Sequence, residues 1–174
     1  MKKLIAAVFI LVAMAGTTAS AQDLSEMSDL EYAHIAYTAD NIDIRYAHLA
    51  LALSRNPDIH DFARTMIRDH TAVNEAALGL LEKLGAAAQD NAFSQTLNAN
   101  AEEIIDGFVT LRGAAFDAAY AANELAYHKA VNDLVENTMI PNIDNAEVKA
   151  LFEQGLEIFK AHERHAEMMV KALQ

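Results

Sequence analysis

Residues 56–85, NPDIHDFARTMIRDHTAVNEAALGLLEKLG, contain the clearest structural signal in the chain. Asn56 followed by Pro57 is typical of a helix start, with Asn as the N-cap and Pro in the first turn. Gly85 is typical of a helix end. Because His70 falls in the middle of the apolar face, the pattern predicts an amphipathic helix over 57–84 with an inward histidine. The apolar residues that share this face are Ile59, Ala63, Met66, Val73, Ala77 and Leu81.

Three further long helices are predicted on either side of this one, over about 29–54, 114–138 and 144–173. A shorter helix over about 94–111 is expected between them, with Ser94 as its N-cap. Capping-box patterns mark the starts of the first and the last long helix, namely Ser28 with Glu31 and Asp144 with Glu147.

The connections between these helices predict an all-α fold. Short connections near 55–56 and 139–144 would form two antiparallel helical hairpins, and the long segment 85–113 would cross from one hairpin to the other. No stretch shows the strict alternation of a half-buried strand. We therefore predict a ferritin-like four-helix bundle formed by one domain over residues 22–174.

The first 21 residues predict export. Lys2 and Lys3 precede an apolar run of twelve residues, Leu4 to Ala15, and small residues follow up to Ala21. This layout is typical of a secretory signal peptide over residues 1–21, and the run is short for a membrane span. A signal anchor is the alternative. No later run is long enough to cross a bilayer, so we expect a periplasmic or secreted protein without a transmembrane segment.

Composition excludes several classes of function. The chain has no Cys, which excludes disulfides, thiolate metal sites and a Cys nucleophile. Its formal net charge of −12 disfavours nucleic acid as a partner. No Gly-rich phosphate loop and no Ser–His–Asp or H-E-x-x-H pattern is present. We therefore expect a binding protein rather than an enzyme, and a homo-oligomer stays open.

Polar side chains that can bind metals fall on apolar helix faces. Counting about 100° per residue places His70 and His162 within the stripes of the second and fourth long helices. Asp43 takes a similar position on the first long helix. Burying such groups is costly unless they pair with one another or hold a metal. On the third long helix the inward polar residues are Asp117, Glu124 and His128.

The distances of these residues from the helix connections predict that they meet. Asp43 and His70 are about equally far from the first connection, and Glu124 and His162 are similarly matched about the second. Imidazole with carboxylate suits iron, manganese, zinc or copper. The alternatives are a His–carboxylate network that fixes helix register in a structural or stress-related envelope protein, and acid–base catalysis without metal. The predicted metal ligands are His70, Glu124, His128 and His162, with Asp43 or Asp117 as a further ligand or acceptor.

One spacing typical of di-iron bundles has another explanation. Glu31-x-x-His34 matches the ligand motif of such proteins. However, Glu31 is also the third residue of the capping box that begins at Ser28, and that role predicts its position better.

The combined motifs resemble a family of exported bacterial proteins, the domain-of-unknown-function family 4142, which carries the label "predicted outer membrane protein". The resemblance spans about residues 29 to 173 and implies a ferritin-like four-helix fold without a settled activity. Its histidine positions coincide with His70, His128 and His162. The residues that carry it are Asn56, Pro57, Phe62, Ala63, Met66, Asp69, His70, Phe116, Asp117, Tyr120, Glu124, His128 and His162, with Asp43, Leu49 and Ala50 before them.

Overall fold

The computed structural model describes residues 24–174, and within this part of the chain all regular structure is helical. The predicted signal peptide lies outside the described residues. The long helices are α1 (Asp29–Leu53), α2 (Pro57–Leu84), α4 (Ala114–Leu134) and α6 (Ala146–Ala172), and α3 (Ala92–Phe108) lies in the crossover. Three short elements complete the order: η1 (Leu24–Glu26), η2 (Val135–Met139, a π-helical turn) and α5 (Ile140–Asn142).

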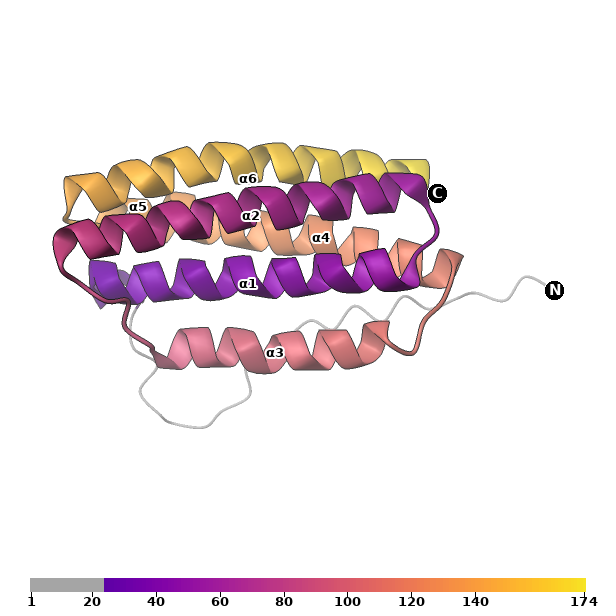
Figure 1. The fold of residues 1–174 in the computed structure, drawn as a ribbon, viewed down its shortest axis with the longest axis horizontal. Coiled ribbons are helices and arrows are strands. Elements are labelled where there is room, and N and C mark those ends of the chain that lie inside the picture. The colour runs from indigo at the N-terminus through magenta and orange to yellow at the C-terminus, as the bar shows by residue number, and fades with distance from the viewer. Residues whose placement is uncertain (1–23) are drawn as a thin grey trace.

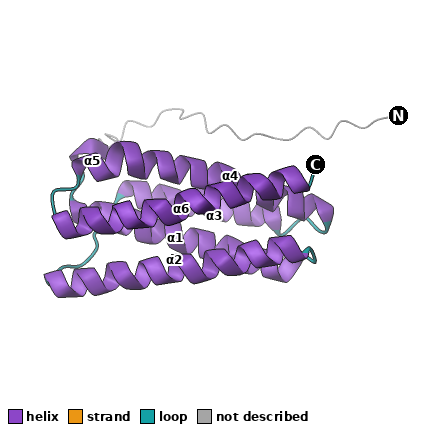
Figure 2. Cartoon of the chain, turned by 90° about the horizontal axis from the view of Figure 1, so that it is seen from above, coloured by secondary structure: helices purple, strands orange, loops and turns teal. Residues whose placement is uncertain are grey.

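The four long helices form a bundle, with α3 laid along its outside next to α1 (Figure 1). α1 pairs with α2 and α4 pairs with α6, as expected of two hairpins, and α2 also packs on α6. The view from above shows the same helices running along one common direction (Figure 2). None of the described helices combines the length and the apolar character needed to cross a membrane.

The helix starts follow from side-chain caps. At α1 the capping box is present, because Ser28 accepts from the Glu31 N–H and Glu31 accepts from the Ser28 N–H. This confirms that Glu31 serves the helix start. At α2, Asn56 accepts from the Asp58 N–H and Pro57 occupies the first turn. Both caps satisfy N–H groups that have no partner inside the helix.

Two predicted caps were wrong by a few residues. α3 begins after Asn91, whose side chain accepts from the Ser94 N–H, so Ser94 is the third helical residue and not the cap. α6 begins after Asn145, which accepts from two N–H groups, so Asp144 is not its cap. Asp144 instead donates its N–H to Oδ1 of Asp29, and Asn145 donates to Oδ2 of the same carboxylate.

The apolar core has two parts with a polar layer between them. One part surrounds Phe62, Phe116 and Tyr120, and the other surrounds Ile35 and Phe152. On α6 the polar residue lies in sequence between the segments that form the two parts, and on α1 Asp40 does so while Asp43 follows Ile42 of the part around Phe62. The bundle therefore encloses a layer of buried polar side chains, which are Asp40, Asp43, His70, Glu124, His128 and His162.

Gly113 provides a test of the crossover. Its φ of 56° and ψ of −140° are adopted almost only by glycine, and it directly precedes α4. Since open space surrounds it, Gly113→Ala adds backbone strain and no clash. We expect the free energy of unfolding to fall by roughly 1–3 kcal/mol in urea denaturation.

Gly79→Ala is the matched control for this substitution. Gly79 lies on an exposed part of α2 with open space around the added methyl group. Alanine there should raise the free energy of unfolding by about 0.5–1 kcal/mol. Equal stability of Gly113→Ala and the unmodified protein would contradict the strained conformation.

Candidate metal centre

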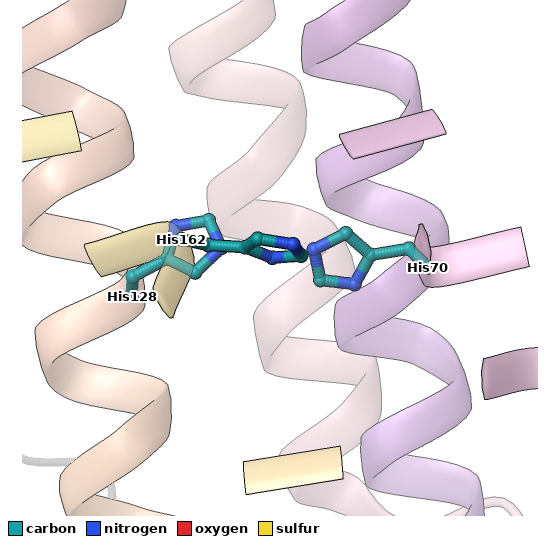
Figure 3. Close-up of side chains that lie close together, drawn as sticks. All are labelled: His70, His128 and His162. Carbon is teal, nitrogen blue, oxygen red and sulfur yellow. The ribbon is translucent and has the colours of Figure 1, made fainter. Parts of the chain in front are cut away.

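Three helices each place one histidine in the polar layer. His70 comes from α2, His128 from α4 and His162 from α6, and Figure 3 shows the three rings turned toward one another. All three are buried, with at most 3% of each residue exposed. Their ring centroids form a nearly equilateral triangle with sides of 5.2, 5.4 and 5.7 Å. The helix packing thus brings together imidazoles that are far apart in sequence.

One nitrogen of each ring has a partner that fixes the ring. His70 Nδ1 lies 2.7 Å from Oδ1 of Asp40, and His162 Nε2 lies 3.0 Å from Oδ2 of Asp69. His128 Nδ1 lies 2.9 Å from the backbone oxygen of Glu124. A carbonyl or carboxylate oxygen can only accept, so each of these nitrogens is the N–H donor. This is the arrangement by which proteins orient histidine ligands of metals.

The other nitrogen of each ring is buried and has no hydrogen-bond partner. These atoms are His70 Nε2, His128 Nε2 and His162 Nδ1. His70 Nε2 lies 2.6 Å from Oδ2 of Asp43, a distance at which the two groups form an ion pair when the ring is protonated. One nitrogen from each ring lies within 4.8 Å of the others. Ligand atoms at about 2.1 Å from a common ion are at most about 4.2 Å apart, so a small inward movement of the rings is enough for all three to reach one ion.

A second group shares His128 with the first. Asp43, Glu124 and His128 also bring one possible ligand atom each within 4.8 Å. Both carboxylates are fully buried, and none of their oxygens has a hydrogen-bond partner. Oδ2 of Asp43 lies 3.6 Å from Nε2 of His128. The two groups therefore form one continuous cluster of donor atoms.

Opposite charges face each other in the layer in the absence of metal. Burial disfavours a charged imidazole, but the carboxylates of Asp43 and Asp40 outweigh it and raise the pKa of His70 to about 10. Burial would raise the pKa of Asp43, but the neighbouring His70 outweighs it and lowers that pKa. At neutral pH the layer thus contains an imidazolium of His70 facing a carboxylate of Asp43.

Burial determines the charge of the next three groups. It raises the pKa of Glu124 well above its ordinary value, and the adjacent Asp43 adds to this. Burial lowers the pKa of His128. It also lowers the pKa of His162 to about 4, against the hydrogen bond to Asp69. Burial thus favours the neutral form of each of these three side chains, and the neutral rings of His128 and His162 each keep a lone pair that can bind a metal.

Aromatic rings enclose the cluster. Phe159 stacks on His70 with 4.8 Å between centroids and 12° between planes. Phe62 meets His128 edge-on at 6.4 Å. The hydroxyl of Tyr120 is buried without a hydrogen-bond partner. These rings cover the layer with apolar surface, so its polar atoms need partners within the layer, either one another or a bound ion or water molecule.

The structure brings five of the six predicted ligand residues together. Asp43, His70, Glu124, His128 and His162 belong to the two groups described above. Asp117, the sixth, belongs to neither group, and its Oδ1 accepts from the Ser54 hydroxyl at 2.6 Å. It is buried on the same helix as Glu124 but lies two turns away in sequence.

Sequence reasoning missed the residues that orient the histidines. Asp40 precedes Asp43 by three residues on α1 and lies on the same helical face, a spacing that could have revealed it. Asp69 is next to His70 in sequence but serves His162 across the helix interface. No spacing rule connects residues 93 positions apart, so this second partner required the structure.

The fold and this cluster define an all-helical bundle with a buried His–carboxylate layer. Its sequence matches the family model described as "Domain of unknown function (DUF4142)" over residues 13–169, and the chain belongs to that family. The resemblance noted from the motifs is thereby confirmed. Neither a curated protein nor a solved structure matched the chain.

The lowered pKa of His162 predicts acid sensitivity of the metal-free protein. The pKa of His162 is about 4 in the folded protein and 6.5 in its ordinary state. Between pH 4 and 6.5 the unfolded chain therefore binds a proton at His162 more readily than the folded protein does. Stability from His162 is therefore present above pH 6.5 and is lost as the pH falls toward 4. In chelator, His162→Gln should make the urea midpoint fall less steeply from pH 7 to 4 than in the unmodified protein.

His48→Gln is the control for this measurement, because His48 is exposed on α1. It should leave the pH profile unchanged. The opposing effect of His70 does not interfere, since its raised pKa contributes stability that is lost only as the pH rises from 6.5 to about 10. Identical acid slopes for His162→Gln and the unmodified protein would contradict the buried neutral state of His162.

Proposed function

We propose that this protein binds a transition metal ion through His70, His128 and His162, with Asp43 and Glu124 as further ligands. The observation that carries the proposal is that three helices each place one ring nitrogen within 4.8 Å of the others, in a layer where each ring has a nitrogen without a hydrogen-bond partner. Leaving such a nitrogen unsatisfied costs free energy, and a cation at their common centre would be ligated by His128 and His162 at once and by His70 after it releases the proton on Nε2. The ion would then replace the imidazolium of His70 as the positive charge next to Asp43.

The donor set favours certain ions. Neutral imidazoles with carboxylates suit zinc, iron, manganese and copper, whereas calcium and magnesium prefer oxygen ligands alone. Asp40, Asp69 and the carbonyl of Glu124 already orient the three rings. The chain would thus provide both the ligands and the acceptors that hold those ligands in place.

The wider setting of this site is part of the proposal. We infer a ferritin-like architecture, supported by four long helices with the ligands in the bundle core. Glu124 and His128 are four residues apart, and the core has no Glu-x-x-His pair typical of di-iron proteins. We therefore propose metal buffering, or a redox step under stress, in place of ferroxidase activity. The leader-like residues 1–21 support a role in the periplasm or outside the cell.

A structural network is the second candidate. His70 with Asp40 and His162 with Asp69 form direct contacts that need no metal. Such pairs could fix the register of α1, α2 and α6 in a bundle that serves a protein partner. This reading leaves Nε2 of His128, Nδ1 of His162 and the carboxyl group of Glu124 without hydrogen-bond partners, which is why we favour metal binding.

Elemental analysis distinguishes the two candidates. The protein is purified from its native host without chelator or affinity tag, and its metal content is measured by plasma mass spectrometry. We expect a near-stoichiometric transition metal, lost in His128→Ala and retained in His48→Ala, whose histidine is exposed. Absence of metal from the unmodified protein, together with lowered stability of His128→Ala, would favour the structural network.

Asp40 and Asp117 provide a second test of the ligand assignment. Asp40→Asn weakens the acceptor that orients His70, so cobalt(II) affinity should fall about 10- to 100-fold in an absorption titration. Asp117→Asn keeps an oxygen for the Ser54 hydroxyl and should leave cobalt affinity unchanged. An equal loss in both variants would place the metal elsewhere than in the described cluster.

A further inference from the structure

A hydrogen bond between α4 and α6 lies next to the three histidines. Nδ2 of Asn132 donates to Oε2 of Glu163 at 2.7 Å. Asn132 comes four residues after His128 on α4, so the two side chains lie on one face of that helix, one turn apart. Glu163 directly follows His162 on α6. The Asn132–Glu163 pair therefore adjoins a proposed metal ligand on each of the two helices.

The two members of this pair differ in exposure. Glu163 is partly exposed to solvent, whereas Asn132 is only 4% exposed. Oδ1 of Asn132 is buried and has no hydrogen-bond partner. A buried amide oxygen without a partner costs free energy, so this amide gains a partner if it turns toward a cation. The pair thus forms a short polar path from the surface toward the buried layer.

Glu163 also carries a charge that no basic side chain neutralises. On the same side of the bundle, Glu136 pairs with Lys160 at 2.8 Å, but no ion pair within residues 24–174 includes Glu163. Burial lowers the pKa of His128, and the charge of Glu163 acts in the opposite direction, so its field reaches that ring. A cation near α4 and α6 is therefore attracted toward the histidines.

Asp69 is a second partly exposed acid beside the histidines, with 22% of its side chain exposed. Its Oδ1 accepts from Nε of Arg68 at 2.6 Å. Its Oδ2 accepts from Arg68 and from His162, at 3.0 Å in each case. Both oxygens are thus occupied, and the guanidinium group repels a cation. The side of the bundle between α4 and α6 is therefore the more favourable one for an ion to enter.

We propose that Glu163 and Asn132 form the entrance through which a divalent cation reaches the three histidines. The cation first binds the carboxylate of Glu163 and replaces the hydrogen bond from Asn132. The amide of Asn132 then turns its Oδ1 to the ion, which passes to His128 one helical turn away. This inference rests on the proposed metal binding and adds the route by which the ion enters and leaves.

Glu163→Gln tests the charge at the entrance. Glutamine keeps an oxygen that can accept from Asn132, so the variant should fold. Metal-free protein is mixed with cobalt(II) chloride, and cobalt absorption is followed by stopped flow. We expect association about tenfold slower, because the charge that attracts the ion is absent. The ion leaves by the same route, so a chelator should also remove bound cobalt about tenfold more slowly while the equilibrium affinity is kept.

Glu136→Gln is the matched control. It removes one negative charge from the same side of the bundle, but that charge is already paired with Lys160. Cobalt should enter and leave this variant at the rates of the unmodified protein. Equal slowing in Glu136→Gln and Glu163→Gln would reduce the effect to the net charge of the surface and overturn the entrance.

Asn132→Leu tests the passage without a change in charge. Leucine has nearly the size of asparagine but lacks the oxygen that would hold the ion between α4 and α6. Both cobalt rates should fall about tenfold, because one polar contact is lost on the way in and out. Unchanged rates in this variant would show that the ion does not pass Asn132, which would overturn the entrance.

The same measurements separate this inference from the proposed function. If the unmodified protein binds no cobalt, both are overturned. If it binds cobalt and Glu163→Gln has unchanged rates, or only faster release, the entrance alone is overturned. Faster uptake by Arg68→Gln together with unchanged uptake by Glu163→Gln would place the entrance at Asp69 instead. Slower entry and slower release at equal affinity, in both Glu163→Gln and Asn132→Leu, support the entrance proposed here.

Discussion

The contact of His70 with Asp43 is the constraint on which the rest of the bundle depends. A fully buried carboxylate needs a positive charge close by, and His70 provides it at 2.6 Å from the neighbouring helix. Asp40 holds the other side of the same ring, so α1 and α2 can pair in only one register. His128 and His162 then extend the polar layer to α4 and α6, and the apolar residues form two cores around it.

The two cores differ in how well they are filled. The part around Phe62 contains several aromatic rings in edge contacts, including Tyr120, Phe108 and Phe116. The other part uses Ala, Val and Leu along much of its wall, and Gly155 leaves further room on α6. The smaller side chains along this part leave a partly open cavity of about 310 Å³ next to the polar layer.

Local sequence signals predicted α1 and α2 well, because their caps and Pro57 act within a few residues. These signals failed at the starts of α3 and α6, because two neighbouring residues could each act as the N-cap. The caps are Asn91 in place of Ser94 and Asn145 in place of Asp144. At α6 the choice depends on Asp29, which binds the Asp144 N–H from 115 residues away. Helical periodicity correctly predicted that five of the six residues face one cluster, but Asp117 pairs with Ser54, the residue that follows α1. The space between packed helices depends on side chains that are far apart in sequence. The spacing of residues along one helix therefore could not predict the cavity.

The carboxylate of Asp29 connects distant parts of the chain. It belongs to the first turn of α1, and it accepts from two N–H groups just before α6. The crossover containing α3 is the covalent link between the two hairpins. The Asp29 contact is a second, non-covalent link between the start of the first hairpin and the start of α6. If one hairpin separates from the other, both hydrogen bonds to Asp29 must break. Unfolding should accordingly be a single cooperative transition, with the first and last long helices separating in the same step.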